Sequence, residues 1–240
     1  MGMPPSASPR RASSRATSRT RRAKAESRGV VTLSVLSSGV NANHYSVTIG
    51  RQRVDLPLVA LSEHLTLALL ITVDQGVTFM ELAGQDLADQ LRPFDVEVVA
   101  TVATMGIPVA IEVTRSLGLD QYVVLHKTPK IHLSDAEFEP VRSITTAVEQ
   151  RLLFDRARVS SVAGRRVAIV DDVISTGAST GAALRLLRRL GADVVAIGTL
   201  VTEANLWRGA LGDDASLVRA LGEIPVFHPS EEGWVEDWEG

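Results

Sequence analysis

The chain has 240 residues, 45% of them hydrophobic, and no cysteine, so it can bury the core of one sizeable domain without disulfides or thiolate chemistry. Its longest apolar run, residues 65–73, is too short to span a bilayer. The formal net charge of −3 hides an asymmetry. Residues 1–30 hold seven Arg and one Lys against one Glu, about +7, which leaves about −10 on the remainder.

Residues 1–28 are rich in Ser, Ala and Arg and show no apolar periodicity, which predicts a disordered basic tail ahead of a domain at 29–240. Three other interpretations of the tail stay open. They are an organelle transit peptide, a basic arm that touches nucleic acid, and a translation start placed too far upstream. The tail has no apolar signal core, so secretion is not expected and the expected location is the cytoplasm.

The first half of the domain predicts short strands followed by two helices. Candidate strands cover 30–36, 44–49 and 53–59, and the alternation of Tyr45, Val47 and Ile49 favours a hairpin of the last two. A helix over 63–72, capped by Ser62, and a helix over 77–91, ended by Pro93, are then expected.

The remainder alternates strands and helices. Strands are predicted at 95–102, at 121–125, in the apolar run that begins at 167 and ends in Asp171 and Asp172, and at 193–201. A helix at 108–117 is predicted between the first two strands and a helix at 182–190 between the last two. This alternation predicts an α/β fold with a parallel sheet and helices on both faces.

The chemistry concentrates in residues 167–181, which read as strand, loop and helix. Asp171 and Asp172 stand at the carboxyl end of the strand, where open α/β sheets bind ligands. The loop that follows offers hydroxyls and helix N-terminal amides, which suit a phosphate. Carboxylates would repel that phosphate but suit hydroxyls or magnesium, so a phosphorylated sugar satisfies both halves.

Two common nucleotide-binding motifs do not fit residues 167–181. A Walker A loop needs a lysine that is missing here, and a dinucleotide fingerprint has its acidic residue downstream of the glycines rather than before them. An ordinary strand–turn–helix with a capped N-terminus would need no ligand at all, and it stays open as the alternative.

The run closely resembles the 5-phosphoribosyl-1-diphosphate (PRPP) motif of type I phosphoribosyltransferases. The resemblance implies a central, mostly parallel sheet flanked by helices, with a small hood (30–60 and 203–240) and a flexible lid at about 128–146. It implies that Asp171 and Asp172 hold the ribose hydroxyls and, through the ribose or water, Mg²⁺. The 5-phosphate would be held by the loop residues Ser175, Thr176, Gly177, Ala178, Ser179 and Thr180.

Further site residues follow from the same resemblance. Thr104, Met105 and Gly106 occupy the place of the diphosphate loop, but Ala103 and Thr104 stand where relatives often carry a Glu. The other implied contacts are Lys127 (catalytic, with the two aspartates) and Lys130 toward the diphosphate, Trp207 toward the base or packed under the C-terminal segment, and Arg142, Ser143 and Thr145 on the closing lid.

The implied activity is that of a purine phosphoribosyltransferase, which forms a nucleoside monophosphate and diphosphate from PRPP and a purine base. Adenine is the favoured base, with hypoxanthine, guanine or xanthine as alternatives and orotate less favoured. A non-catalytic PRPP-binding regulator is the competing class; the missing Glu favours it, and the lack of a helix-turn-helix pattern in 29–75 opposes it. The resemblance implies a homodimer, with neither membrane nor nucleic acid as a partner.

Overall fold

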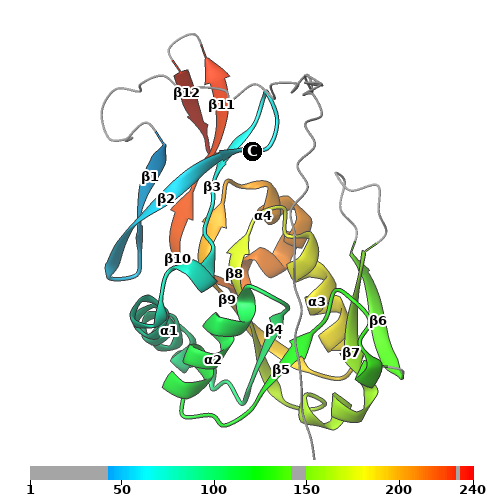
Figure 1. The fold of residues 1–240 in the computed structure, drawn as a ribbon. Coiled ribbons are helices and arrows are strands. Elements are labelled where there is room, and N and C mark those ends of the chain that lie inside the picture. The colour runs from blue at the N-terminus through cyan, green and yellow to red at the C-terminus, as the bar shows by residue number, and fades with distance from the viewer. Residues whose placement is uncertain (1–42, 134, 142–149, 231–232) are drawn as a thin grey trace, which may run out of the picture. The chain divides into compact units, whose positions relative to one another are not determined.

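The computed structural model of the protein describes residues 43–133, 135–141, 150–230 and 233–240 (Figure 1). The basic tail, the strand expected at 30–36 and the lid residues Arg142, Ser143 and Thr145 lie outside the described residues. In the part that is described, no helix is long and apolar enough to cross a membrane.

A five-stranded parallel sheet forms the centre of the domain and confirms the α/β expectation. Its strand order is β10-β9-β8-β4-β5, and every neighbouring pair is parallel. In that order the strands are β10 (Val218–Ile224), β9 (Asp193–Glu203), β8 (Arg166–Ile174), β4 (Val98–Val102) and β5 (Tyr122–Leu125).

Both faces of this sheet are covered by helices. Along β8, Ala168 and Val170 belong to the core beneath α1 (Val77–Leu91) and α2 (Gly106–Ser116). Val167 and Ile169 belong to the opposite core, beneath α3 (Ala178–Arg189). Because successive strand residues point to opposite faces, an unbroken apolar run is what a strand buried on both sides requires.

A second, antiparallel sheet forms the hood. Its order is β1-β2-β3-β11-β12, with the strands β1 (His44–Ile49), β2 (Gln52–Ala60), β3 (Thr66–Ala68), β11 (Val226–Ser230) and β12 (Gly233–Asp237). The β1–β2 hairpin was predicted and is confirmed. Tyr45 and Phe227 meet edge to face across the hood, with ring centroids 5.4 Å apart.

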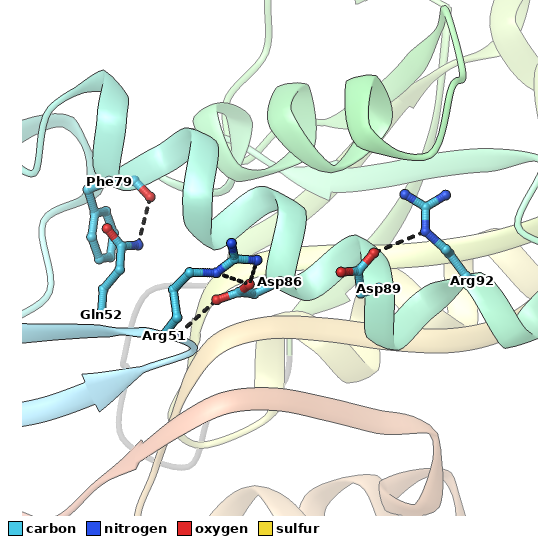
Figure 2. A network of polar contacts seen from close by, with 6 residues as sticks. All are labelled: Arg51, Gln52, Phe79, Asp86, Asp89 and Arg92. Carbon is cyan, nitrogen blue, oxygen red and sulfur yellow. Dashed lines mark hydrogen bonds and ion pairs between the residues drawn. The ribbon is translucent and has the colours of Figure 1, made fainter.

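A polar network joins the β1–β2 turn to helix α1 (Figure 2). The backbone N–H of Arg51 donates to Asp86 Oδ2 at 2.8 Å, and Arg51 Nε donates to Asp86 Oδ1 at 2.7 Å. Gln52 Nε2 donates to the Phe79 carbonyl at 3.1 Å. Gly50 has φ +59°, and a Cβ there would lie 2.2 Å from Asp86 Oδ2, so the close approach of turn and carboxylate requires glycine.

The helix expected over 63–72 is wrong. Ser62 Oγ accepts from the His64 backbone N–H, but this closes a turn and starts no helix. The chain then enters β3, where Thr66 and Ala68 are buried while Leu67 is partly exposed. Pairing with both β2 and β11 makes β3 the central hood strand, so tertiary contacts override a helical pattern.

Two segments near the ends of the sheets change partners or form new ones. The segment 221–227 divides at Pro225, because β10 joins the central sheet while β11 joins the hood. The segment predicted as a lid, about 128–146, contains β6 (Ala136–Val141), which pairs with β7 (Gln150–Asp155) as a separate two-stranded sheet.

The remaining short elements connect these parts. They are η1 (Thr72–Asp74), η2 (Arg92–Phe94), η3 (Ile131–Leu133), η4 (Arg156–Ser161), α4 (Leu206–Leu211) and η5 (Gly212–Leu217).

Candidate active site

A cavity of about 260 Å³ opens at the carboxyl edge of the parallel sheet. It is lined by residues in the last part of β4 and β8 and in the segments that follow β4, β5 and β8: Val102, Ala103, Thr104, Met105, Lys127, Asp171, Asp172, Val173, Ser175 and Ser179. Parallel strands end at the same edge of a sheet, so segments far apart in sequence meet there. The structure thus brings together the two aspartates, the first lysine and parts of both predicted loops.

The two aspartates of β8 differ in environment. Asp171 is 8% exposed and accepts a hydrogen bond from the Asp172 backbone N–H at 3.1 Å, while Asp172 is only partly buried. Burial, and then the neighbouring Asp172 carboxylate, raise the pKa of the Asp171 carboxyl well above its ordinary value, and Lys127 partly offsets this. Two acids held side by side, with Lys127 only partly offsetting their charge, suit a ligand that brings hydroxyls or positive charge.

The loop between β4 and α2 lies directly against Asp171. A Cβ on Gly106 would stand 2.4 Å from Thr101 Oγ1 and 2.5 Å from Asp171 Oδ1, distances that real side chains do not reach. Thr101 is fully buried, and its hydroxyl has no hydrogen-bond partner among the described residues. On the outer side, Thr72 Oγ1 donates to the Met105 carbonyl at 2.9 Å and holds the loop from the hood-side segment η1.

The loop between β8 and α3, together with the start of α3, forms another part of the cavity wall. Gly177 has φ +75° and packs against the backbone of Trp207. Helix α3 begins at Ala178, whose N–H donates to Thr176 Oγ1 at 3.4 Å, and the N–H groups of a first helical turn have no carbonyl partner within the helix. Ser175 and Ser179 line the cavity. Thr176 is exposed and Thr180 is 3% exposed; neither lines it, so the hydroxyl contribution is smaller than the sequence suggests.

The predicted lysines are separated by the structure. Lys127 lines the cavity and acts electrostatically on Asp171. Lys130 is exposed, does not line the cavity, and its carbonyl accepts from the Leu133 N–H at the start of η3. Lys127 is therefore the cation that this edge of the sheet offers within the described lining.

Trp207 is not available for stacking on a base. The side chain is 2% exposed, and its Nε1 donates to the Ala204 carbonyl at 3.0 Å. The guanidinium of Arg208 lies 4.3 Å from its ring centroid. The ring packs in the α3-side core and supports Gly177, which corrects its candidate role toward the base.

Two neighbours of the cavity-lining residues were not predicted from the sequence. Glu203, the last residue of β9, is 6% exposed and accepts a hydrogen bond from Ser175 Oγ at 2.5 Å. An acid shortly after the strand predicted over 193–201 is the signal that could have found it. Thr72 had no signal, because its contact with Met105 spans 33 residues of sequence.

The donor set fits a magnesium ion that keeps most of its water. In the part of the chain described here, no cluster of three acidic or imidazole side chains could hold a metal alone. Magnesium is ordinarily bound by one or two carboxylates together with water and substrate phosphates. Asp171 and Asp172, both on the cavity wall, match that arrangement when a phosphorylated ligand is present.

Comparison with known proteins matches most of the chain to a family. The phosphoribosyl transferase domain family matches residues 80–228, more than half of the chain. The adenine phosphoribosyltransferase of Mycobacterium tuberculosis is 31% identical over 172 residues, which cover 71% of this chain and 75% of that protein. The orotate phosphoribosyltransferase of Caldanaerobacter subterraneus subsp. tengcongensis is 27% identical over 131 residues, 55% of this chain and 57% of that protein.

Another orotate phosphoribosyltransferase, from Desulforamulus reducens, is 32% identical over 121 residues, 50% of this chain and 52% of that protein. The chain thus spans little more than half the length of these two orotate relatives. Among solved structures, the adenine phosphoribosyltransferase of Thermoanaerobacter pseudethanolicus superposes with a TM-score of 0.59 at 18% identity, over 69% of this chain and 94% of that one. At that identity the superposition shows a shared fold.

Proposed function

The chain belongs to the phosphoribosyl transferase domain family, and we propose that it transfers the 5-phosphoribosyl group of PRPP to a purine base, adenine favoured. The products are a nucleoside monophosphate and diphosphate. The observation that carries the proposal is the cavity that joins two carboxylates, a phosphate loop, a second glycine loop and one lysine.

Each part of PRPP has a counterpart in this cavity. The 5-phosphate is assigned to the α3 N-terminus with Ser175 and Ser179. The ribose hydroxyls are assigned to Asp171 and Asp172, whose carboxylates can each accept a hydrogen bond. The diphosphate is assigned to the backbone of 104–106 and to Lys127.

The reaction forms one bond and breaks one bond at C1 of the ribose. A ring nitrogen of the base attacks C1, and the C1–oxygen bond breaks with its electron pair leaving on the diphosphate. The proton on the base nitrogen is lost to solvent or to the departing diphosphate. Positive charge develops on the ribose in the transition state, so the two carboxylates stabilise it while Lys127 stabilises the leaving group.

Magnesium, when bound with the substrate, neutralises part of the diphosphate charge. Asp171 and Asp172 would hold it through the ribose hydroxyls or through water. The chain's own residues then position C1 and limit access of competing water.

Adenine is proposed as the base because of the share of each relative that this chain covers. The adenine enzyme of M. tuberculosis shares more of its length with this chain than the orotate enzymes of C. subterraneus and D. reducens do. Orotate is the second candidate, because enzymes named for it are among the matched relatives. The non-catalytic regulator is kept as the competing class, since Ala103 stands in the diphosphate loop with no carboxylate.

The test is product formation from PRPP and magnesium with each of adenine, hypoxanthine, guanine, xanthine and orotate. Chromatography should identify AMP as the main product. A different nucleotide as the main product would change the assigned base but would still support phosphoribosyl transfer. Tight PRPP binding with no nucleotide from any base would establish the regulator instead.

A further inference from the structure

A buried acid stands directly behind the phosphate loop. Glu203 ends β9 and is 6% exposed, and its Oε2 accepts the hydrogen bond of Ser175 Oγ at 2.5 Å. Ser175 lines the cavity where the 5-phosphate is assigned. The proposed phosphoribosyl transfer uses Ser175 and leaves Glu203 without a role.

Among the residues that the structure describes, no cation near Glu203 offsets the cost of burying its carboxylate as an anion. Burial raises the pKa of the Glu203 carboxyl, and the Ser175 hydrogen bond lowers it by less. On β10, Ile224 stands opposite Glu203, and Glu223 is exposed. On β8, Asp172 faces the cavity.

The arginines of the packed helices are engaged elsewhere. On α4, Arg208 donates to Asn205. On α3, Arg185 donates to Glu139 and Arg188 donates to Asp214. Ser175 is thus the fixed polar partner of Glu203 among the described residues, and it is also a wall of the phosphate site.

The charge of Glu203 decides which way the Ser175 hydroxyl can point. An ionised carboxylate can only accept hydrogen bonds, so the Ser175 hydroxyl donates its hydrogen bond to Glu203 and presents only oxygen lone pairs to the cavity. A protonated carboxyl can donate to Ser175 Oγ, which frees the hydroxyl proton for a phosphate oxygen. An incoming phosphate also disfavours a second buried negative charge beside it.

We propose that Glu203 is a positioning residue of the phosphate site, and that binding of a sugar phosphate is coupled to uptake of a proton by Glu203, which turns the Ser175 hydroxyl toward the phosphate. This rests on the proposed function only in placing the 5-phosphate at this loop. The sign follows from linkage: a ligand that favours the protonated form binds more weakly as pH rises, by up to about tenfold per pH unit for one proton.

The probe is ribose 5-phosphate, measured by isothermal titration calorimetry from about pH 6 to about pH 9 in buffers of different ionisation enthalpy. Each titration gives both affinity and protons taken up. The phosphate's own second ionisation, with a pKa of about 6, contributes equally to all variants and cancels in their comparison. The variants are Glu203→Gln and Ser175→Ala, with Glu223→Gln as the control for loss of an exposed acid on the neighbouring strand.

Wild type and Glu223→Gln should take up protons on binding and lose affinity as pH rises. In Glu203→Gln the amide can always donate to Ser175, so both affinity and proton count should become flat with pH apart from the ligand's own titration. Ser175→Ala should bind several-fold more weakly and take up fewer protons. This variant tests the coupling between Glu203 and Ser175 even if Glu203→Gln fails to fold.

The inference is overturned if wild type binds ribose 5-phosphate with the same pH dependence and proton count as Glu203→Gln, or as Ser175→Ala. In that outcome the proposed function stands. If wild type binds neither ribose 5-phosphate nor PRPP at any pH, the proposed function itself fails and takes the inference with it.

Discussion

At the scale of single residues, Gly106 shows how tightly the candidate site is assembled. A Cβ at this position would collide with both the Thr101 hydroxyl and the Asp171 carboxylate, each within 2.5 Å. Neither neighbour can withdraw easily, because Thr101 is fully buried and Asp171 is 8% exposed. The diphosphate loop and the carboxylate therefore share one packing interface.

Gly106→Ala should consequently lower the free energy of unfolding by about 1–3 kcal/mol through overpacking. It should also reduce kcat/KM by about 100-fold, because the loop and Asp171 move apart. The measurements are urea denaturation and steady-state kinetics. Gly209→Ala is the matched control, since nothing lies within 4 Å of its Cβ position and its φ is ordinary. A Gly106→Ala enzyme with wild-type kinetics would contradict the packing argument.

Asp171 and Asp172 are predicted to serve the ligand rather than the fold. Replacing both with Asn should remove charged hydrogen bonds of about 1.5–3 kcal/mol each, which corresponds to at least about 100-fold in kcat/KM. Stability should be equal or higher at neutral pH. An acid whose folded pKa is raised, as Asp171's is by burial, destabilises the fold once it ionises. Thermal unfolding checks the second point, and a large loss of stability would contradict it.

The sequence was informative about these residues for a physical reason. Asp171, Asp172 and Ser175 are close together in the chain, so their spacing alone reports a ligand site. Glu203 and Thr72 reach the site only through tertiary contacts. Trp207 could not be placed either, because an aromatic ring at a strand's carboxyl end serves packing and stacking equally well in a linear pattern.

At the scale of elements, the hydrogen bonds of Arg51 with Asp86 join the β1–β2 turn of the hood to helix α1 (Figure 2). Burial raises the pKa of the Asp86 carboxyl, but the Arg51 side-chain and backbone hydrogen bonds outweigh it, and the net shift is downward. A depressed acid contributes stability above its unfolded pKa and loses it as pH falls through the folded pKa.

Asp86→Asn should therefore lower the free energy of unfolding by about 1 kcal/mol at neutral pH. The difference from wild type should shrink as the pH falls below about 4. Asp89→Asn, on the same helix and paired with exposed Arg92, is the control and should change stability by less than about 0.5 kcal/mol. If denaturant titrations gave the same change in the free energy of unfolding for both substitutions, the ion pair of Arg51 and Asp86 would not stabilise the fold more than an exposed pair does.

Elements with strong local signals were predictable, and those defined by partners were not. Helix α1 has a complete apolar face and was expected over the residues where it occurs. β3 has only three residues and exists because β2 and β11 flank it. β10 and β11 are nearly continuous in sequence yet enter different sheets, a choice that no local periodicity encodes.

At the scale of the whole molecule, the chain combines a basic N-terminal segment with an acidic body. The candidate site is built from β4, β5, β8 and the loops after them, all C-terminal to residue 97. Removal of residues 1–28 should therefore leave kcat/KM within about twofold of the full chain, because no part of the described cavity comes from them. A loss beyond about tenfold in the truncated protein would give the tail a catalytic role.

Phosphorus NMR of PRPP follows transfer of the phosphoribosyl group through the bond that breaks and the ester that forms. With enzyme, magnesium and adenine present, the diphosphate-ester signals should disappear while inorganic diphosphate and a new phosphomonoester grow at equal rates. Without base they should persist, and Asp171→Asn with Asp172→Asn should prevent the change. If the PRPP signals shift on binding yet persist with every purine and with orotate, the protein binds PRPP without transferring its phosphoribosyl group.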